Sequence, residues 1–99
     1  MIFTSKKTEN CFADSETYEY SLPITGEQLL SRLAGWEIRK NCKLRRPVGI
    51  AQKDGVTVKT VLAGQLARVS FPQESWQQEK EKFESWLSHE QDPTGNLDL

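Results

Sequence analysis

The dipeptide Asp54-Gly55 constrains the fold of this chain more than any other short feature. Both central positions of a tight type I′ hairpin turn need positive φ, which Asp and Gly accept with little strain. Valines and isoleucines recur on both sides of the dipeptide. Residues 48–53 and 56–62 are therefore predicted to be extended segments that pair antiparallel.

Two further segments alternate with the period of a strand. At 66–71, Ala67, Val69 and Phe71 alternate with polar residues, which predicts a last strand joined to 56–62 by a short turn. At 17–22, tyrosines and a leucine alternate with polar residues and predict a first strand. Consecutive strands with short connections form an antiparallel sheet.

The stretch 36–46 also alternates, and it is rich in basic residues. Its apolar parity holds four residues: Trp36, Ile38, Cys42 and Leu44. We predict a strand with one buried face and one positively charged wet face, extended onward to residue 53. Cys42 is then expected to be a half-buried, unreactive thiol.

Two helices are predicted from their capping signals. Thr25 and Gln28 have capping-box spacing before a short apolar run, and Ser75 and Gln78 have it before a longer one. The order β-α-β-β-β-α predicts an α+β two-layer sandwich, with an antiparallel sheet of about four strands and two helices on one face.

The length of 99 residues suits a single domain. We predict a flexible N-terminal arm over 1–16 that could include a short strand at 2–4, the α+β domain over 17–90, and a disordered acidic tail over 91–99. No segment reaches the roughly 18 apolar residues that cross a membrane, and none resembles a signal peptide. The expected location is therefore the cytoplasm, with no membrane partner.

Charge is distributed unevenly along the chain. Residues 36–68 contain eight basic and two acidic residues, a charge of +6. Residues 1–35 contain three basic and five acidic residues (−2), and residues 69–99 contain two and seven (−5). A basic centre between acidic ends predicts an electrostatic binding surface.

The predicted partner-binding residues are basic and lie in or beside the predicted strands: Arg39, Lys40, Lys43, Arg45, Arg46 and Lys59. The preferred partner is an acidic protein surface. The alternative is a nucleic acid held through its phosphates by the same residues. A third interpretation gives the charges no partner: they protect an exposed sheet edge from aggregation, or the acidic segment 69–99 neutralises them within the same chain.

Catalytic chemistry is not expected. The one histidine, His89, falls at the end of the last predicted helix, and no nucleophile lies in a recognisable catalytic motif. Two cysteines, Cys11 and Cys42, are too few and too far apart for a zinc site. We therefore predict no catalytic residue, metal or other cofactor.

The last predicted helix carries a narrow aromatic stripe. Trp76, Phe83 and Trp86 are spaced to share one face. Packing against the sheet is the preferred explanation. An exposed part of the stripe, at Trp76 or Trp86, would instead serve as an interface with a partner or within a homodimer.

Overall fold

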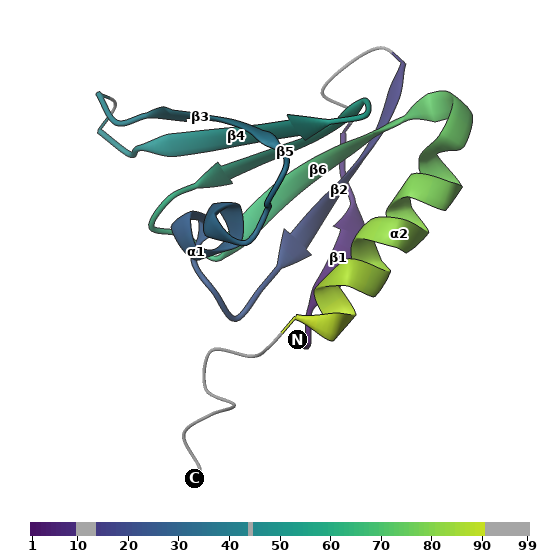
Figure 1. Cartoon of the computed structure of the whole chain (residues 1–99), viewed down its shortest axis with the longest axis horizontal. Coiled ribbons are helices and arrows are strands. Elements are labelled where there is room, and N and C mark those ends of the chain that lie inside the picture. Colours follow the sequence, from purple (N-terminus) through teal and green to yellow (C-terminus); the bar gives the residue numbers. More distant parts are fainter. Residues whose placement is uncertain (10–13, 44, 91–99) are drawn as a thin grey trace, which may run out of the picture.

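The computed structural model describes residues 1–9, 14–43 and 45–90. Within them, six strands form one antiparallel sheet in the order β1-β2-β6-β5-β4-β3, and two α-helices accompany it (Figure 1). The strands are β1 (Thr4–Lys7), β2 (Ser15–Ser21), β3 (Glu37–Asn41), β4 (Val48–Lys53), β5 (Val56–Val61) and β6 (Leu66–Pro72). The helices are α1 (Gly26–Ser31) and α2 (Trp76–His89), which follows a 3-10 turn, η1 (Gln73–Ser75).

The α+β class, the antiparallel sheet and the two helices are confirmed. The prediction of about four strands in the order β-α-β-β-β-α is wrong, because the observed order is β-β-α-β-β-β-β-α. One additional strand is β1, which was assigned to an N-terminal arm over 1–16; Ser15 and Glu16, also assigned to that arm, begin β2. The sequence of β1 has no apolar alternation that would predict a strand, since all four residues are polar and exposed on a sheet edge. The predicted tail, 91–99, lies outside the described residues.

The other additional strand comes from the stretch predicted as one long extended segment. The chain turns after Asn41, whose side-chain Oδ1 accepts a hydrogen bond from the backbone N–H of Lys43 at 3.1 Å. It then returns as β4, with Val48 opposite Asn41. A short polar side chain that bonds to the backbone two residues onward is a common way to start a turn.

The prediction of a buried face on this stretch is also wrong. All five residues of β3 are exposed, and so is Cys42, which was expected to be half-buried. Only Trp36, just before β3, packs partly against the core. Leu44 lies outside the described residues.

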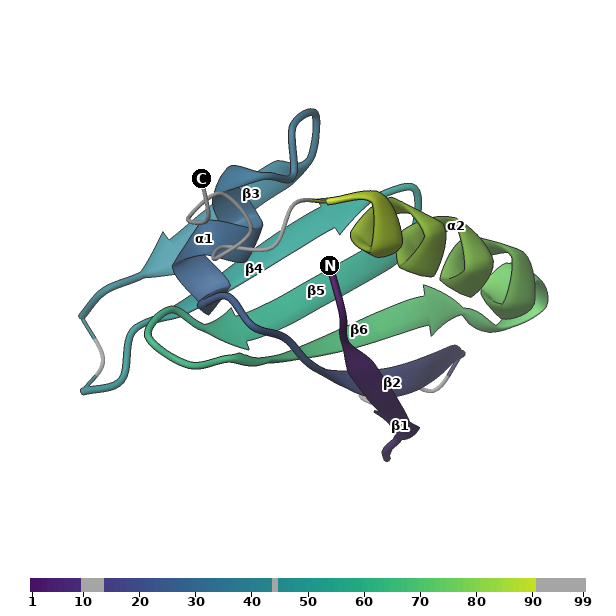
Figure 2. The same ribbon diagram turned by 90° about the horizontal axis from the view of Figure 1, so that it is seen from below.

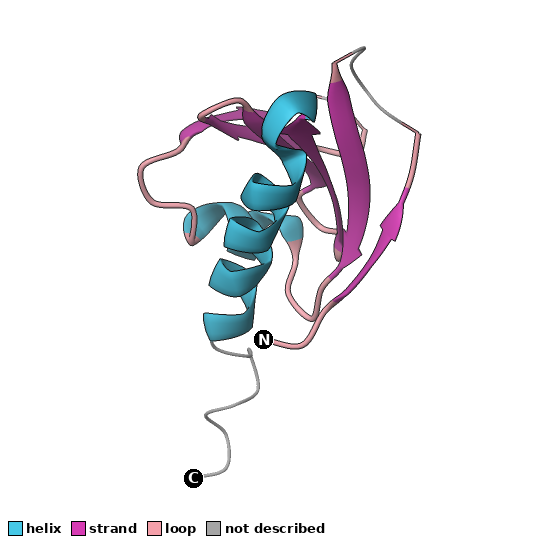
Figure 3. Ribbon diagram, turned by 90° about the vertical axis from the view of Figure 1, so that its right-hand side faces the viewer, coloured by secondary structure: helices cyan, strands magenta, loops and turns pink. Residues whose placement is uncertain are grey.

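The core lies between the helices and one face of the sheet, hereafter the helix face (Figure 3). Val58 and Val69, opposite each other on β5 and β6, are fully buried there. Phe83 of α2 packs edge-on against Tyr20 of β2, with ring centroids 5.4 Å apart. Each large apolar side chain removed from water in this way contributes about 1.5–3 kcal/mol.

The position of α1 follows from close contacts with two central strands. The capping box of Thr25 and Gln28 forms as predicted. Gly26, which follows Thr25, approaches β5 so closely that a Cβ there would meet the backbone oxygen of Val61. A Cβ on Gly49 of β4 would meet the side chain of Leu30. The helix is therefore seated over β4 and β5, which leaves β3 uncovered.

The second helix lies over the other half of the sheet (Figure 2). Ser75 is the N-cap residue of α2, as predicted, but the predicted capping box does not form, because Ser75 ends η1 and makes no side-chain cap bond. At the far end, the α-amino group of Met1 donates to the carbonyl oxygens of Leu87, Ser88 and Glu90, at 3.2, 3.1 and 2.7 Å. A positive charge at a helix C-terminus is favourable, so this contact joins the segment before β1 to α2.

Candidate functional site

The face of the sheet opposite the helices, hereafter the open face, carries a row of residues that crosses all six strands and is charged on five of them. Lys59 directly follows the buried Val58, and Arg68 directly precedes the buried Val69. Because successive side chains of a strand point to opposite faces, Lys59 and Arg68 point to the open face. The strand register aligns six residues, hereafter the charged row: Lys6, Glu19, Arg68, Lys59, Ile50 and Arg39. Neighbours in such a row are separated by one strand spacing, roughly 5 Å.

The charged row is not balanced. Glu19 is its single carboxylate, and its side chain lies within 3.3 Å of Lys6 and 3.7 Å of Arg68. With four basic residues and one acidic residue, the row carries +3. On the β5, β4 and β3 half of the row, Lys59 and Arg39 flank Ile50, and Arg39 lies 3.8 Å from the carboxylate of Glu37, two positions earlier on β3.

An aliphatic groove runs beside the charged row. Its apolar walls come from three strands, and its volume is about 460 Å³. The aliphatic groove is defined by Val48, Ile50, Val61 and Leu66, and Lys59 and Arg68 stand at its rim. Leu66 is 50% exposed, which is unusual for a leucine in a sheet that has a well-filled core.

The structure separates the predicted partner-binding residues into two groups. Arg39 and Lys59 lie in the charged row, two strands apart. The second group is the exposed basic loop between β3 and β4, which contains Lys43, Arg45 and Arg46. Lys40 belongs to neither, because its place on β3 puts it on the opposite side of the strand from Arg39.

Arg68 is the functional candidate that sequence reasoning missed. It lies in the basic segment 36–68 but outside the predicted partner-binding set. Its position could have been inferred, because a short turn between 56–62 and 66–71 brings a basic residue of each strand together. The register pairs it directly with Lys59.

The two tryptophans predicted as interface residues have different surroundings. Trp76 stacks on Tyr18 of β2, with ring centroids 5.9 Å apart. Trp86 packs against Phe83 at 5.8 Å and lines a pocket between the helices. Both are half-buried, so part of each indole packs against the core, as the preferred explanation of the stripe requires.

The titratable group with the largest change in pKa is Tyr20, which lies beneath α2 and contributes to the packing of that helix on the sheet. The hydroxyl of Tyr20 donates to Glu84 Oε2 at 2.7 Å, and Lys80 pairs with the same carboxylate at 2.6 Å. Burial, followed by the adjacent Glu84, raises the pKa of Tyr20 far above its usual value. A tyrosine that holds its proton so strongly is a hydrogen-bond donor that ties β2 to α2.

Within residues 1–9, 14–43 and 45–90, no three histidine, cysteine or acidic side chains gather in a way that would hold a metal ion. His89 lies at the end of α2, with Nδ1 2.7 Å from the carbonyl oxygen of Ser85. No helix in the described part of the chain has the length and hydrophobicity needed to span a bilayer. Comparisons with protein-family models, curated proteins and solved structures found no match.

Proposed function

We propose that this protein is a small non-catalytic binding or regulatory module that docks the open face of its sheet onto an acidic protein partner. The observation that carries the proposal is the contact between the charged row and the aliphatic groove on that face. A surface that offers cations beside apolar side chains complements a partner segment that alternates acidic and aliphatic residues.

The two parts of the surface contribute differently. Exposed ion pairs of the kind Arg39 and Lys59 would form are worth only about 0.2–1 kcal/mol each. Their main effect is on association rate and on partner selection. Burial of aliphatic groups in the groove, at about 25 cal/mol per Å², supplies the more durable part of the affinity.

Nucleic-acid binding is the second candidate, and the basic loop favours it. Lys43, Arg45 and Arg46 are all exposed, and phosphate contacts need no apolar groove. Base stacking has less support, because the strand aromatics Tyr18, Tyr20 and Phe71 all pack on the helix face. The proposal prefers a protein partner because the open face offers aliphatic side chains.

We also propose a cytoplasmic location. Cys42 is an exposed free thiol, and such thiols persist where glutathione and thioredoxin keep them reduced.

The test uses two defined probes and two charge-matched double variants. The probes are a synthetic peptide of alternating Glu and Leu and an oligothymidylate, each titrated into the protein at low salt and followed by amide NMR. Arg39→Glu/Lys59→Glu changes the open face, and Arg45→Glu/Arg46→Glu changes the basic loop by the same charge.

The expected result is that the peptide shifts signals of β4, β5 and β6. Reversal on the open face should weaken the peptide about tenfold, and reversal in the loop should weaken it less than twofold. Retained amide spectra in both variants show that folding is unchanged. The proposal is overturned if only the oligonucleotide binds, or if the loop variant weakens the peptide more than the open-face variant does.

A further inference from the structure

A second concave site lies on the helix face, between the end of α1, the β4–β5 turn and α2. Its volume is about 460 Å³, within the usual range for small-molecule pockets. Figure 2 shows β4 and β5 in the space that the two helices leave between them. This site is on the opposite side of the sheet from the charged row, so it is independent of the proposed docking surface.

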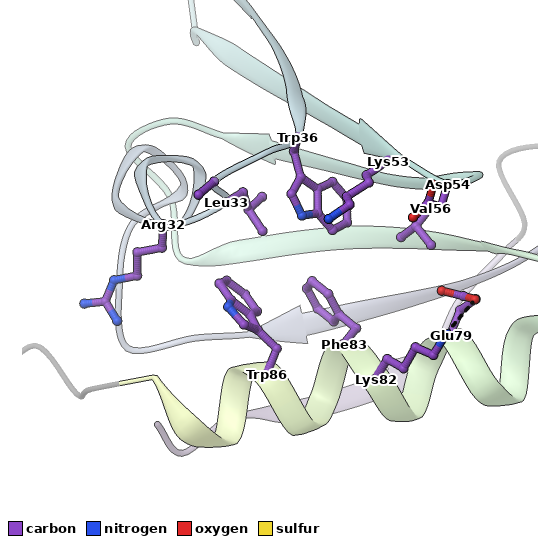
Figure 4. Close-up of a pocket in the computed structure, with 11 residues that line it drawn as sticks. Arg32, Leu33, Trp36, Lys53, Asp54, Val56, Glu79, Lys82, Phe83 and Trp86 are labelled. Carbon is purple, nitrogen blue, oxygen red and sulfur yellow. Dashed lines mark ion pairs between the residues drawn. The ribbon is translucent and has the colours of Figure 1, made fainter.

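The pocket is walled by aromatic rings from two directions. Phe83 and Trp86 project from α2 toward the sheet, and Trp36 projects from the segment before β3 (Figure 4). The rings of Phe83 and Trp86 are 5.8 Å apart and inclined at 38°. The indoles of Trp36 and Trp86 are only half-buried. Aromatic faces that retain exposure in a concave site favour a flat, ring-containing ligand.

The charged side chains at the rim determine which sign of charge the ligand should carry. Arg32 and Lys82 are engaged with Glu90 and Glu79, at 3.5 and 3.6 Å. Among the described residues, Lys53 makes no ion pair within 4.0 Å.

Lys53 is also well placed for this role. Its Nζ lies 3.9 Å from the position that a Cβ would take on Gly35, directly before Trp36. Its ammonium therefore stands at the aromatic wall. Three cations and two carboxylates line the pocket. Because Arg32 pairs with Glu90 and Lys82 with Glu79, the lining charges that make no ion pair within 4.0 Å among the described residues are Lys53 and Asp54.

We propose that this pocket binds a small planar aromatic carboxylate. The ring lies among Trp36, Trp86 and Phe83, and the carboxylate pairs with the ammonium of Lys53. The aromatic stripe and the basic segment do not by themselves predict this site, because Trp36 and Trp86 come from distant parts of the chain and line one pocket only in the folded protein.

The test is a titration with 2-naphthoate followed through the indole N–H signals of the three tryptophans. Each signal is assigned by a single Trp→Phe variant. The expected result is that Trp36 and Trp86 shift in parallel at millimolar ligand, whereas Trp76 does not. Trp76 is the internal control because it stacks on Tyr18 and does not line the pocket.

Two variants and a neutral analogue test the charge contact. Lys53→Gln should weaken 2-naphthoate about fivefold and leave 2-naphthamide unchanged. Lys40→Gln removes an exposed lysine that does not line the pocket, so it should change neither affinity. The proposal is overturned if Trp36 and Trp86 do not shift, if all three indoles shift equally, or if Lys53→Gln and Lys40→Gln give the same affinity for 2-naphthoate.

Discussion

Strands β6 and β3 both alternate apolar and polar residues, but the apolar side chains of β6 are buried and those of β3 are exposed. In β6, Ala67, Val69 and Phe71 alternate with polar residues, and all three are buried. In β3, Ile38 alternates with Glu37 and Arg39, yet every residue of the strand is exposed.

The difference comes from position in the sheet. β6 lies between β2 and β5 and is covered by α2, whereas β3 is an edge strand bonded only to β4. The close contacts at Gly26 and Gly49 hold α1 over β4 and β5, so within the described part of the chain β3 is left exposed. Alternation thus identifies a strand and tells which side chains share a face. It does not tell whether another layer covers that face.

The largest expected effect tests this contrast directly. Phe71→Ala removes a fully buried ring from β6 and should lower the free energy of unfolding by about 3–5 kcal/mol. Ile38→Ala is the matched truncation on the helix side of β3 and should cost less than about 0.5 kcal/mol. Urea unfolding measures both. A cost for Ile38→Ala close to that for Phe71→Ala would show that β3 is covered in solution.

An intermediate effect should test why α1 sits where it does. Gly26→Ala places a methyl group against the backbone oxygen of Val61, which cannot move aside easily, and should cost about 2–3 kcal/mol. Gly64→Ala is the control, because its Cβ would meet neighbours only at 3.5 Å or more. We expect that change to lie within about 0.5 kcal/mol of zero. Equal costs in thermal unfolding would mean that the close approach of α1 to β5 does not determine its position.

The smallest effect concerns the polar contact that holds α2 over the other half of the sheet. Tyr20→Phe removes the hydrogen bond to Glu84 and should cost about 1–2 kcal/mol at neutral pH, measured by urea unfolding. Glu84 retains its ion pair with Lys80, which limits the loss.

The same variant has a signature at high pH. Because the folded state raises the pKa of Tyr20 above its usual value of about 10, folding keeps the phenol protonated. Below that pH the group is neutral in both states and adds no pH dependence. Above it only the unfolded chain loses the proton, so Tyr20 should lower stability by roughly 1.4 kcal/mol per pH unit. Tyr20→Phe should lack this slope, and identical slopes in the two proteins would contradict the assignment.

The candidate site was only partly predictable. The basic segment was visible as charge, and Arg39 and Lys59 were identified from it. The division between the open face and the basic loop was not visible, because alternation through residue 46 concealed the turn that begins at Asn41. Arg68 could have been placed near Lys59 from the short turn that joins their strands. The aliphatic groove could not, because it needs the register of three strands, β4, β5 and β6.

The sequence alone determined the local conformations with strong physical causes. Asp54 and Gly55 adopt the positive φ values of 52° and 83° that their turn requires. Thr25 and Gln28 form their reciprocal cap, because such contacts involve residues only a few positions apart. The tertiary structure decided which alternating strand would be buried and which would be an edge. That choice depends on where helices find close contact with strands, and the same packing places Trp36 and Trp86 around one pocket although they are far apart in the chain.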